Sequence, residues 1–323
     1  MNSRNLIPIA VLHPALPTPD DLLDAFAQFL RIDVANGDAS LDTIAGYRSQ
    51  VAQWVDWCAA NSIDPAMATE HDVKLYRQSL VESGYKASSI SHKLVVLRRF
   101  YASAQQRGWR SDNPVDGVKA PRDKRPVDDV PVLAEVDVAL LLRAVPKDGT
   151  EASLRDRAML GLMALQGLRT VEVHRANVED LQTRGESAVL HVRGKGRDRL
   201  AYLRPDVASA IEEYLATKRE AVPDEQGTPM FCAVGNRSGG RRLSRRGARQ
   251  IVDGYLKLIE VKRPGLSNHA LRHSAGTLAY RYSKDIRAVQ DMLGHASPTT
   301  TARYAHIVDR EQDNVAAKVP LKL

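Results

Sequence analysis

A proline-rich, charged segment near the middle of the chain, residues 112–131, most constrains how this sequence can fold. It reads DNPVDGVKAPRDKRPVDDVP and has neither a helical nor an alternating apolar period. Proline lacks the N–H that helices and sheets use, and this composition is typical of an interdomain linker. We therefore expect an extended leader at 1–19, a first domain at 20–111, a basic linker at 112–131 and a second domain at 132–323. A chain of 323 residues is long enough for two cores.

Residues 20–111 predict a domain of four helices. Apolar side chains recur at three- and four-residue steps, most clearly from Ile44 to Cys58 and from Ile90 to Ala104, and turn signals separate the segments. Thr69 is placed to cap one of these helices. These rows of apolar side chains predict helix faces that are buried in the core and not catalytic residues.

Charge is uneven within this first domain. In residues 20–72 the only Lys or Arg residues are Arg31 and Arg48, whereas in residues 73–111 the only Asp or Glu is Glu82. The net charge of +7 favours a polyanion, either nucleic acid or an anionic membrane surface. A run of exposed cations is also common on a surface that binds nothing. If the partner is DNA, the expected phosphate contacts are Lys86, Lys93, Arg98, Arg99 and, in the linker, Lys119.

Residues 132–323 predict a mostly helical domain with one small sheet. The stretch AVLHVRGKGRDRLAYL, residues 188–203, alternates on both sides of a Gly194-Lys195-Gly196 turn, which predicts a two-stranded hairpin. Pro205 fits the first position of the next helix, and Ser244 fits an N-cap further on.

Two isolated cations in this domain have both ordinary and functional interpretations. Arg169 follows Gly167, a natural terminator of the apolar helix before it, and an ordinary ion pair with Glu172 three residues on would explain it. Lys195 lies at a glycine-flanked turn, where an exposed lysine is unremarkable. Neither position is specific by itself.

The motif NHALRH, residues 268–273, is more informative. Residues three and four apart are neighbours on a helix, so His269, Arg272 and His273 are expected to converge on an anion. The histidine spacing also matches a zinc helix, but Ala270 stands where such helices carry Glu, and Arg272 would repel a cation. We therefore expect no metal at this site.

The order of the motifs GLRTVE, GKG, HALRH, LGH and a tyrosine near the end of the sequence resembles the tyrosine recombinase (phage integrase) family. The resemblance covers nearly the whole chain from about residue 20. It implies a mainly α fold with a small β-sheet: an N-terminal four-helix core-binding (SAM-like) domain and a C-terminal α+β catalytic domain that together clamp DNA. The short leader leaves no room for the arm-binding domain of lambda-type integrases, which makes an Xer-like architecture closer. Ala270 and Ser283 depart from the family pattern, away from the proposed chemistry.

The resemblance also implies the catalytic roles. Tyr304 would be the nucleophile that forms a 3′-phosphotyrosyl link, and Lys195 would protonate the departing 5′-oxygen. The paired arginines would hold the non-bridging phosphate oxygens, because guanidinium groups suit bidentate contacts. His269 would transfer protons around the tyrosine, and His295 would donate to a phosphate oxygen. The implied catalytic set is Arg169, Lys195, His269, Arg272, His295 and Tyr304, with Glu172 orienting Arg169 and His273 buttressing its helix.

By the same resemblance, the partner is double-stranded DNA with a specific recombination site. A homotetramer would exchange strands through a Holliday junction, with or without a second recombinase or an accessory protein, and without metal, ATP or another cofactor. The tail after Tyr304 would dock onto a neighbouring protomer. An arginine-rich stretch, GNRSGGRRLSRRGARQ, either is a solvated loop or supplies phosphate contacts, for which we expect Arg241, Arg242, Arg245 and Arg246.

Two other functions remain open at the level of sequence: a type IB topoisomerase-like DNA-relaxing enzyme, and a non-catalytic DNA-binding protein of the same fold. Cys58 and Cys232 form no zinc or redox motif, which favours a reduced, intracellular protein. Pro8 and Pro14 interrupt the apolar N-terminal run, which argues against a signal peptide. No stretch approaches the ~20 apolar residues of a membrane span. The expected location is the cytoplasm, in association with the nucleoid and not with a membrane.

Overall fold

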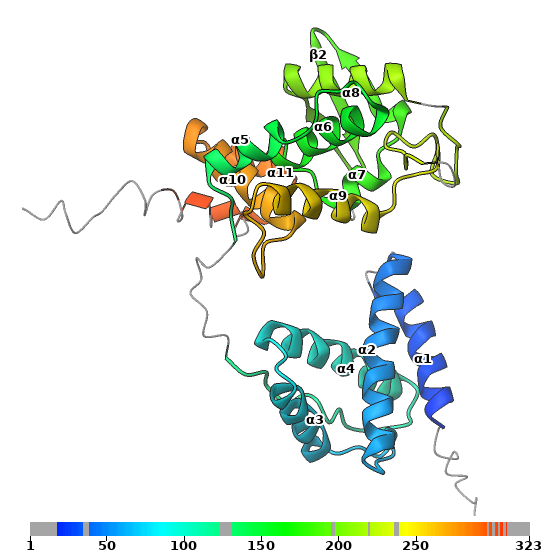
Figure 1. The fold of residues 1–323 in the computed structure, drawn as a ribbon. Coiled ribbons are helices and arrows are strands. Elements are labelled where there is room, and N and C mark those ends of the chain that lie inside the picture. Colours follow the sequence, from blue (N-terminus) through cyan, green and yellow to red (C-terminus); the bar gives the residue numbers. More distant parts are fainter. Residues whose placement is uncertain are drawn as a thin grey trace, which may run out of the picture. The chain divides into compact units, whose positions relative to one another are not determined.

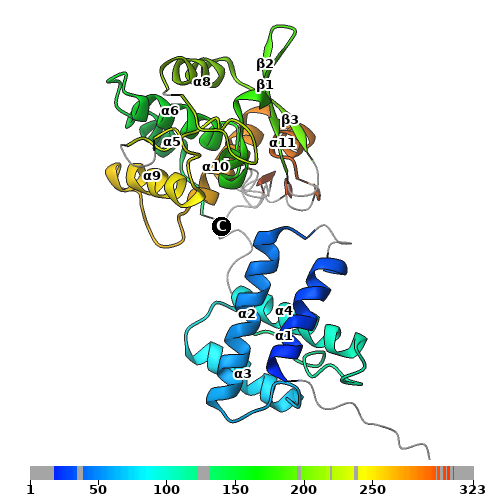
Figure 2. The same cartoon turned by 90° about the vertical axis from the view of Figure 1, so that its right-hand side faces the viewer.

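The structure is a computed structural model of the chain. It describes residues 18–34, 39–122, 131–194, 198–218, 220–235 and 239–295, with positions 297, 298, 301, 302, 304, 305 and 308. The chain divides into two compact units, Met1–Arg125 and Pro126–Leu323 (Figures 1 and 2). The expected two-domain, mainly helical layout is therefore confirmed. Across the described ranges, no helix is long and apolar enough to cross a membrane.

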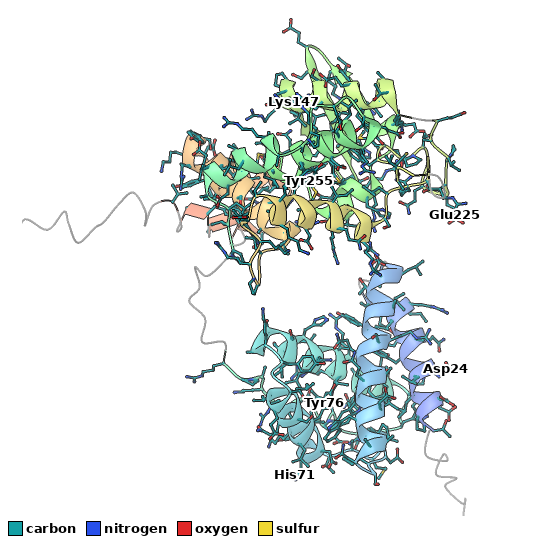
Figure 3. All side chains as sticks on the ribbon, in the orientation of Figure 1. Asp24, His71, Tyr76, Lys147, Glu225 and Tyr255 are labelled. Carbon is teal, nitrogen blue, oxygen red and sulfur yellow. The ribbon has the colours of Figure 1, made fainter. Side chains whose placement is uncertain are left out.

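The N-terminal unit consists of four helices, as predicted: α1 (Pro19–Ile32), α2 (Leu41–Ala60), α3 (Glu70–Glu82) and α4 (Ala87–Gln106). Thr69 caps α3 by accepting from the backbone N–H of Asp72. In the core, Trp54 donates to the hydroxyl of Tyr101 at 3.0 Å. The ring of Tyr76, labelled in Figure 3, lies edge-on to Trp54 at 5.0 Å between centroids.

The beginning of the predicted linker packs onto this unit. Val115 and Val118 are buried in its core, and Arg98 donates to both of their carbonyl oxygens, at 3.1 and 3.2 Å. Residues up to Val118 therefore belong to the N-terminal unit, whereas the sequence predicted a linker from residue 112. Two valines among prolines are too few to show an apolar period in the sequence. Their burial in the core is nevertheless favourable.

The C-terminal unit is mainly helical with one sheet. Its elements in chain order are α5 (Glu135–Arg143), α6 (Glu151–Ala164), α7 (Thr170–Arg175), the 3-10 helix η2 (Val178–Asp180), β1 (Leu181–Arg184), β2 (Ser187–Val192), β3 (Arg199–Tyr202), α8 (Pro205–Thr217), α9 (Arg245–Leu258), α10 (Asn268–Ser283) and α11 (Ile286–Leu293).

Helix α6 forms the centre of this unit. Every residue from Ala158 to Ala164 is buried, and α6 packs against α5, α7, α8 and α10 (Figure 1). A helix that is apolar all round is stable only when other elements cover it. The helices that carry the candidate site therefore rest on one shared core.

The sheet is antiparallel, with strand order β1-β2-β3. The predicted hairpin is present as β2 and β3, with Val192 paired to Arg199. The first strand, β1, was missed, because its sequence LQTR has no alternating apolar pattern and Leu181 is recognisable only through its pairing with Leu190. The hairpin turn at residues 195–197, which includes Lys195, lies outside the described residues.

Candidate active site

The candidate site is built around the carboxylate of Glu172, on the short helix α7. Its side chain is 1% exposed. It accepts from the backbone N–H of Arg169 at 2.8 Å and from Arg169 Nη1 at 2.7 Å. Gly167, at φ +69°, turns the chain from α6 into this segment. The ion pair between Arg169 and Glu172 is therefore present, but it is largely buried and not on a free surface.

Arg272 reaches the same carboxylate from α10. Its side chain is 2% exposed, and Nη1 lies 3.8 Å from Glu172 Oε2. The guanidinium donates to the carbonyl oxygen of Gly167 at 2.7 Å and to that of Leu293. Burial and the nearby Arg169 lower the pKa of Arg272 to about 10, against the opposing effects of Glu172 and Tyr304. Arg272 therefore stays charged at neutral pH and joins three segments of the chain.

A third arginine, Arg199 on β3, completes the cluster and was missed by the sequence analysis. Arg199 Nη1 lies 2.9 Å from Glu172 Oε1, and its side chain is 14% exposed. It packs under the turn after α11, where a Cβ added at Gly294 (φ +64°) would lie 2.7 Å from Arg199 Cδ. Figure 2 shows β3 beside α11. The sequence signal was an arginine at the start of the second hairpin strand, four residues after Lys195.

Opposing effects set the ionisation of Glu172. Burial by itself would raise the pKa of its carboxyl, but hydrogen bonds and charge from Arg199 and Arg169 outweigh burial and lower the pKa. Glu172 is therefore ionised at neutral pH. Three cations around one anion leave the cluster with excess positive charge, which favours binding of a phosphate.

Tyr304 packs against α10 next to this cluster. Its side chain is fully buried, together with Leu293. A Cβ added at Gly276 would lie 2.7 Å from Tyr304 Cε2, so the ring touches the helix backbone. The Tyr304 hydroxyl is 3.1 Å from Nδ1 of His273.

The histidines are arranged differently from the prediction. His273, expected to buttress α10, contacts the Tyr304 hydroxyl, whereas His269 is exposed and lies edge-on to His273 at 4.8 Å between ring centroids. His295 stacks on the Tyr304 ring at 6.2 Å, and its Nδ1 is 2.9 Å from Thr301 Oγ1. The predicted face of NHALRH is therefore split: the two histidines lie together, and Arg272 turns into the interior.

The structure separates the predicted contacts near α9 into two kinds. Ser244 caps α9, as predicted, by accepting from Gly247 N at 3.0 Å. Tyr255, labelled in Figure 3, donates to Asp156 Oδ2 at 3.0 Å and fixes α9 to α6. Of the four arginines predicted to contact phosphates here, Arg241, Arg245 and Arg246 are exposed.

Arg242 does not belong to the exposed set, and its expected phosphate contact is not supported. Its side chain is 7% exposed and pairs with Asp224. It also donates to Asn177 Oδ1 at 2.8 Å and to the carbonyl oxygen of His174 at 3.0 Å. The hydrogen bond from Arg242 lowers the pKa of Asp224 to about 2. Arg242 is therefore a structural residue that joins two loops.

This difference in burial predicts that one of two neighbouring arginines matters for stability and the other for DNA binding. Arg242→Ala is expected to lower the free energy of unfolding by about 2–4 kcal/mol, because buried acceptors lose their donor. Arg246→Ala, at an exposed position, is expected to change stability by less than about 0.5 kcal/mol but to reduce the salt dependence of DNA binding by about one phosphate contact. Urea unfolding and salt titrations of both variants measure this, and a stable Arg242→Ala would contradict it.

In the N-terminal unit, three of the predicted phosphate contacts have intramolecular partners. Lys93 is 4% exposed, which contradicts the expectation of a surface lysine. Arg98 binds the carbonyl oxygens of Val115 and Val118. Arg99 Nη1 donates to the Tyr47 hydroxyl at 3.2 Å. Lys86 and Lys119 are exposed.

Removing Arg199 is expected to change the pH dependence of stability. The lowered pKa of Glu172 means that this carboxylate contributes stability above its unfolded-state pKa of about 4.5, which is lost as the pH falls through the lower, folded-state pKa. In Arg199→Met, burial of Glu172 dominates, its pKa rises, and the loss begins at higher pH. The cost at neutral pH is expected to be about 1–3 kcal/mol.

Urea unfolding of Arg199→Met between about pH 3 and 7 tests this expectation. The matched control is Arg157→Met, because Arg157 pairs with Glu213 at 3.1 Å on an exposed surface, where a pair contributes less than about 1 kcal/mol. Identical pH profiles for wild type and Arg199→Met would refute the role assigned to Arg199.

Comparisons with known proteins cover both units. Residues 131–311 match the phage integrase family, and residues 23–108 match the family of phage integrase N-terminal SAM-like domains. The chain is 32% identical over 269 residues to tyrosine recombinase XerC of Pelobacter propionicus, covering 82% of this chain and 84% of that protein. It is 32% identical over 285 residues to tyrosine recombinase XerD of Bifidobacterium longum, covering 87% and 91%.

Solved structures share the fold. The XerH site-specific recombinase bound to a palindromic difH substrate, in a post-cleavage complex, matches with a TM-score of 0.71 at 17% identity, over 95% of this chain and 98% of that one. The Tn1549 transposon integrase in complex with circular intermediate DNA matches with a TM-score of 0.67 at 16% identity, over 90% and 98%.

Proposed function

Because this chain belongs to the phage integrase family and is a tyrosine-type site-specific DNA recombinase, we propose that Tyr304 is its nucleophile and that the arginine–glutamate cluster holds the scissile phosphate. The observation that carries the proposal is the 3.1 Å contact between His273 and the Tyr304 hydroxyl, beside a cluster with excess positive charge. A phenol that attacks phosphorus needs a proton acceptor and positive charge that stabilises the phosphate. His273 and the arginine cluster offer these two groups beside Tyr304.

In the proposed reaction, Tyr304 Oη attacks phosphorus, and the bond from phosphorus to the 5′-oxygen breaks. Arg169 and Arg272 stabilise the charge on the non-bridging oxygens. The side chain of Arg169 is 34% exposed and can therefore contact the phosphate. The side chain of Arg272 is largely buried and lies on the interior side of the same carboxylate, Glu172. Lys195, assigned through the family motif, protonates the leaving 5′-oxygen. Attack by another 5′-hydroxyl reverses these steps, and the phosphotyrosyl ester conserves the bond energy, so that rejoining requires no ATP.

We assign the proton acceptor for Tyr304 to His273, on the basis of its contact with the hydroxyl. The exposed His269 and the stacked His295 then serve the phosphate side of the site. Tyr304 is fully buried, so its side chain has to turn out of this packing before in-line attack on DNA.

For DNA binding, we propose that the two units hold opposite faces of the duplex through exposed cations. The set comprises Lys86, Lys119, Arg241, Arg245 and Arg246. Four protomers would then exchange strands through a Holliday junction at the nucleoid, with or without a second recombinase or an accessory protein. The tail, at residues 309–323, lies outside the described residues, and its docking onto a neighbouring protomer is part of the proposal.

The test begins with selection of the duplex that the full-length protein binds. A suicide form of that duplex, nicked near the cleavage point, traps the covalent intermediate because the short cleaved strand diffuses away. We expect an adduct that survives denaturant and forms in EDTA without ATP. Relaxation of a supercoiled plasmid that lacks the site would instead indicate a topoisomerase-like enzyme, and DNA binding with no adduct would indicate a non-catalytic protein.

A further inference from the structure

Strands β2 and β3 form a hairpin (Figure 2), and a hydrogen bond closes its base. The backbone N–H of Gly194, after the first strand, donates at 3.1 Å to Asp198 Oδ1, before the second strand. A carboxylate that accepts from a backbone N–H makes one of the stronger hydrogen bonds in proteins. Lys195 follows Gly194 in the sequence and lies in the turn outside the described residues. The bond therefore fixes the two ends of the segment that carries Lys195.

The imidazole of His191 connects this base to the body of the catalytic unit. It lies on β2, with Nε2 3.4 Å from Asp198 Oδ2 and Nδ1 3.6 Å from Asp180 Oδ1. The side chain of Asp180, at the end of η2, is 4% exposed, whereas that of Asp198 is 52% exposed. A histidine between two carboxylates can donate to either one, and to both when it is protonated. His191 therefore bridges an exposed carboxylate and a buried one.

Arg193 adds a second link to the same buried carboxylate. Its Nη2 donates to Asp180 Oδ1 at 3.0 Å, and its Nη1 donates to the carbonyl oxygen of Gln226 at 3.1 Å. Asp180 is itself held in place, because Oδ2 accepts from the backbone N–H of Asn177 at 2.8 Å. The first arm of the hairpin is therefore fixed up to the residue before the closing bond.

The second arm is fixed to the arginine–glutamate cluster. Arg199, the residue after Asp198, donates to Glu172 Oε1 at 2.9 Å and to Oε2 at 3.3 Å. Glu172 also accepts from Arg169, which we propose to contact the phosphate. The position of Asp198 is therefore set relative to the phosphate site, and its bond to Gly194 sets the other end of the turn relative to the same site.

Proton transfer to the leaving oxygen requires a donor in a fixed position. A lysine ammonium lies at the end of a flexible four-carbon stem, so the side chain alone does not define where the proton is delivered. A general acid works only within hydrogen-bond reach of the leaving atom, and a displacement of about 1 Å can reduce the rate by about 100-fold. The backbone at both ends of the turn must therefore supply the alignment that the lysine side chain lacks.

We propose that Asp198 is a positioning residue for strand cleavage: anchored by His191, it closes the base of the turn and so places Lys195 beside the departing 5′-oxygen. This inference rests on the proposed function, in which Lys195 gives a proton to that oxygen as its bond to phosphorus breaks. Asp198 acts through Lys195 and needs no contact with DNA.

A substrate whose leaving group needs no proton isolates this role. In such a duplex, sulfur replaces the bridging 5′-oxygen at the cleavage point, and the electron pair of the broken phosphorus–sulfur bond stays on sulfur. A thiolate leaves without a proton because the pKa of a thiol is about 8.5, far below that of an alcohol. Single-turnover cleavage of the oxygen and sulfur forms of the suicide duplex is measured with saturating full-length protein. The proteins compared are wild type, Asp198→Ala, Asp198→Asn, His191→Ala, Lys195→Met and Glu186→Ala.

For Asp198→Ala, we expect cleavage of the oxygen duplex to slow by roughly 10- to 100-fold, and cleavage of the sulfur duplex to stay within about threefold of wild type. Asp198→Asn keeps an acceptor for the Gly194 N–H and should recover part of the rate. His191→Ala should show the same pattern with a smaller defect. Lys195→Met should slow cleavage of the oxygen duplex by about 10²- to 10⁴-fold and should likewise be rescued by sulfur. The matched control, Glu186→Ala, removes an exposed carboxylate from the β1–β2 turn of the same sheet and should cleave both duplexes at the wild-type rate.

Asp198→Ala that cleaves the oxygen duplex at the wild-type rate, or that is equally slow on both duplexes, overturns the proposal. The same pattern in Glu186→Ala would also overturn it, since any lost carboxylate would then suffice. If Asp198→Ala does not fold, Asp198→Asn and His191→Ala decide by the same comparison. Failure of the proposed function is distinguishable, because Lys195→Met would then be slow on both duplexes or cleave the oxygen duplex like wild type.

Discussion

Tyr304→Phe is expected to form no covalent adduct with the suicide duplex, a loss of about 10⁴-fold or more in the cleavage rate, because the variant lacks the hydroxyl that attacks phosphorus. The phenylalanine ring keeps the packing against Gly276 and Leu293. The hydrogen bond to His273 is lost, at a cost of about 1 kcal/mol in stability. DNA affinity is expected to stay at the wild-type value.

Denaturing gel electrophoresis of the trapped complex measures this outcome. The matched control is Tyr282→Phe. Tyr282 lies on α10, the helix that begins with the NHALRH motif, but it is 72% exposed and donates to Glu135. That variant should form the adduct at the wild-type rate. An adduct of undiminished yield in Tyr304→Phe would assign the nucleophile to another residue.

Arg272→Ala is expected to affect both stability and chemistry. The carbonyl oxygens of Gly167 and Leu293 lose their donor, and Glu172 loses a nearby cation. Breaking such a buried arrangement costs about 2–4 kcal/mol of unfolding free energy. The cleavage rate is expected to fall by about 10³-fold or more, since the variant loses transition-state charge stabilisation together with the alignment of Arg169.

Urea unfolding and single-turnover cleavage separate the two effects. Arg287→Ala serves as the control, because Arg287 is an exposed arginine on α11, where substitution should change stability by less than about 0.5 kcal/mol. Arg272→Lys keeps the charge but not the two-pronged contact, and we expect it to recover stability only in part. If Arg272→Ala unfolds like wild type and cleaves within about tenfold of it, the cluster does not have the role assigned here.

Features that depend on neighbours in sequence could be predicted. The caps at Thr69 and Ser244 and the termination at Gly167 involve contacts within a few residues, and the structure contains each of them. The helical stripes of the first domain are likewise local, since a period of 3.6 residues defines a buried face without knowledge of its partner.

Features that depend on distant residues could not be predicted. The sequence identified Lys93 and Arg242 as cations but not their burial, because Lys93 meets Gln53 40 residues away and Arg242 meets Asn177 65 residues away. Arg199 joins Glu172 across 27 residues. Strand β1 was missed for a different reason: it pairs locally with β2, but its sequence LQTR has no alternating apolar pattern.

By itself, the sequence determined the family, the two-domain helical layout and the residue types of the site, since short motifs and helical periods are written in neighbouring positions. Only the tertiary structure decided which of those groups meet. Folding gave Arg242 and Arg98 hydrogen-bond acceptors within the chain, and packing brought His273 instead of His269 to the Tyr304 hydroxyl. The physical reason is that the direction of a polar side chain depends on where its unsatisfied partners lie after folding, and those partners are set by contacts far away in the chain.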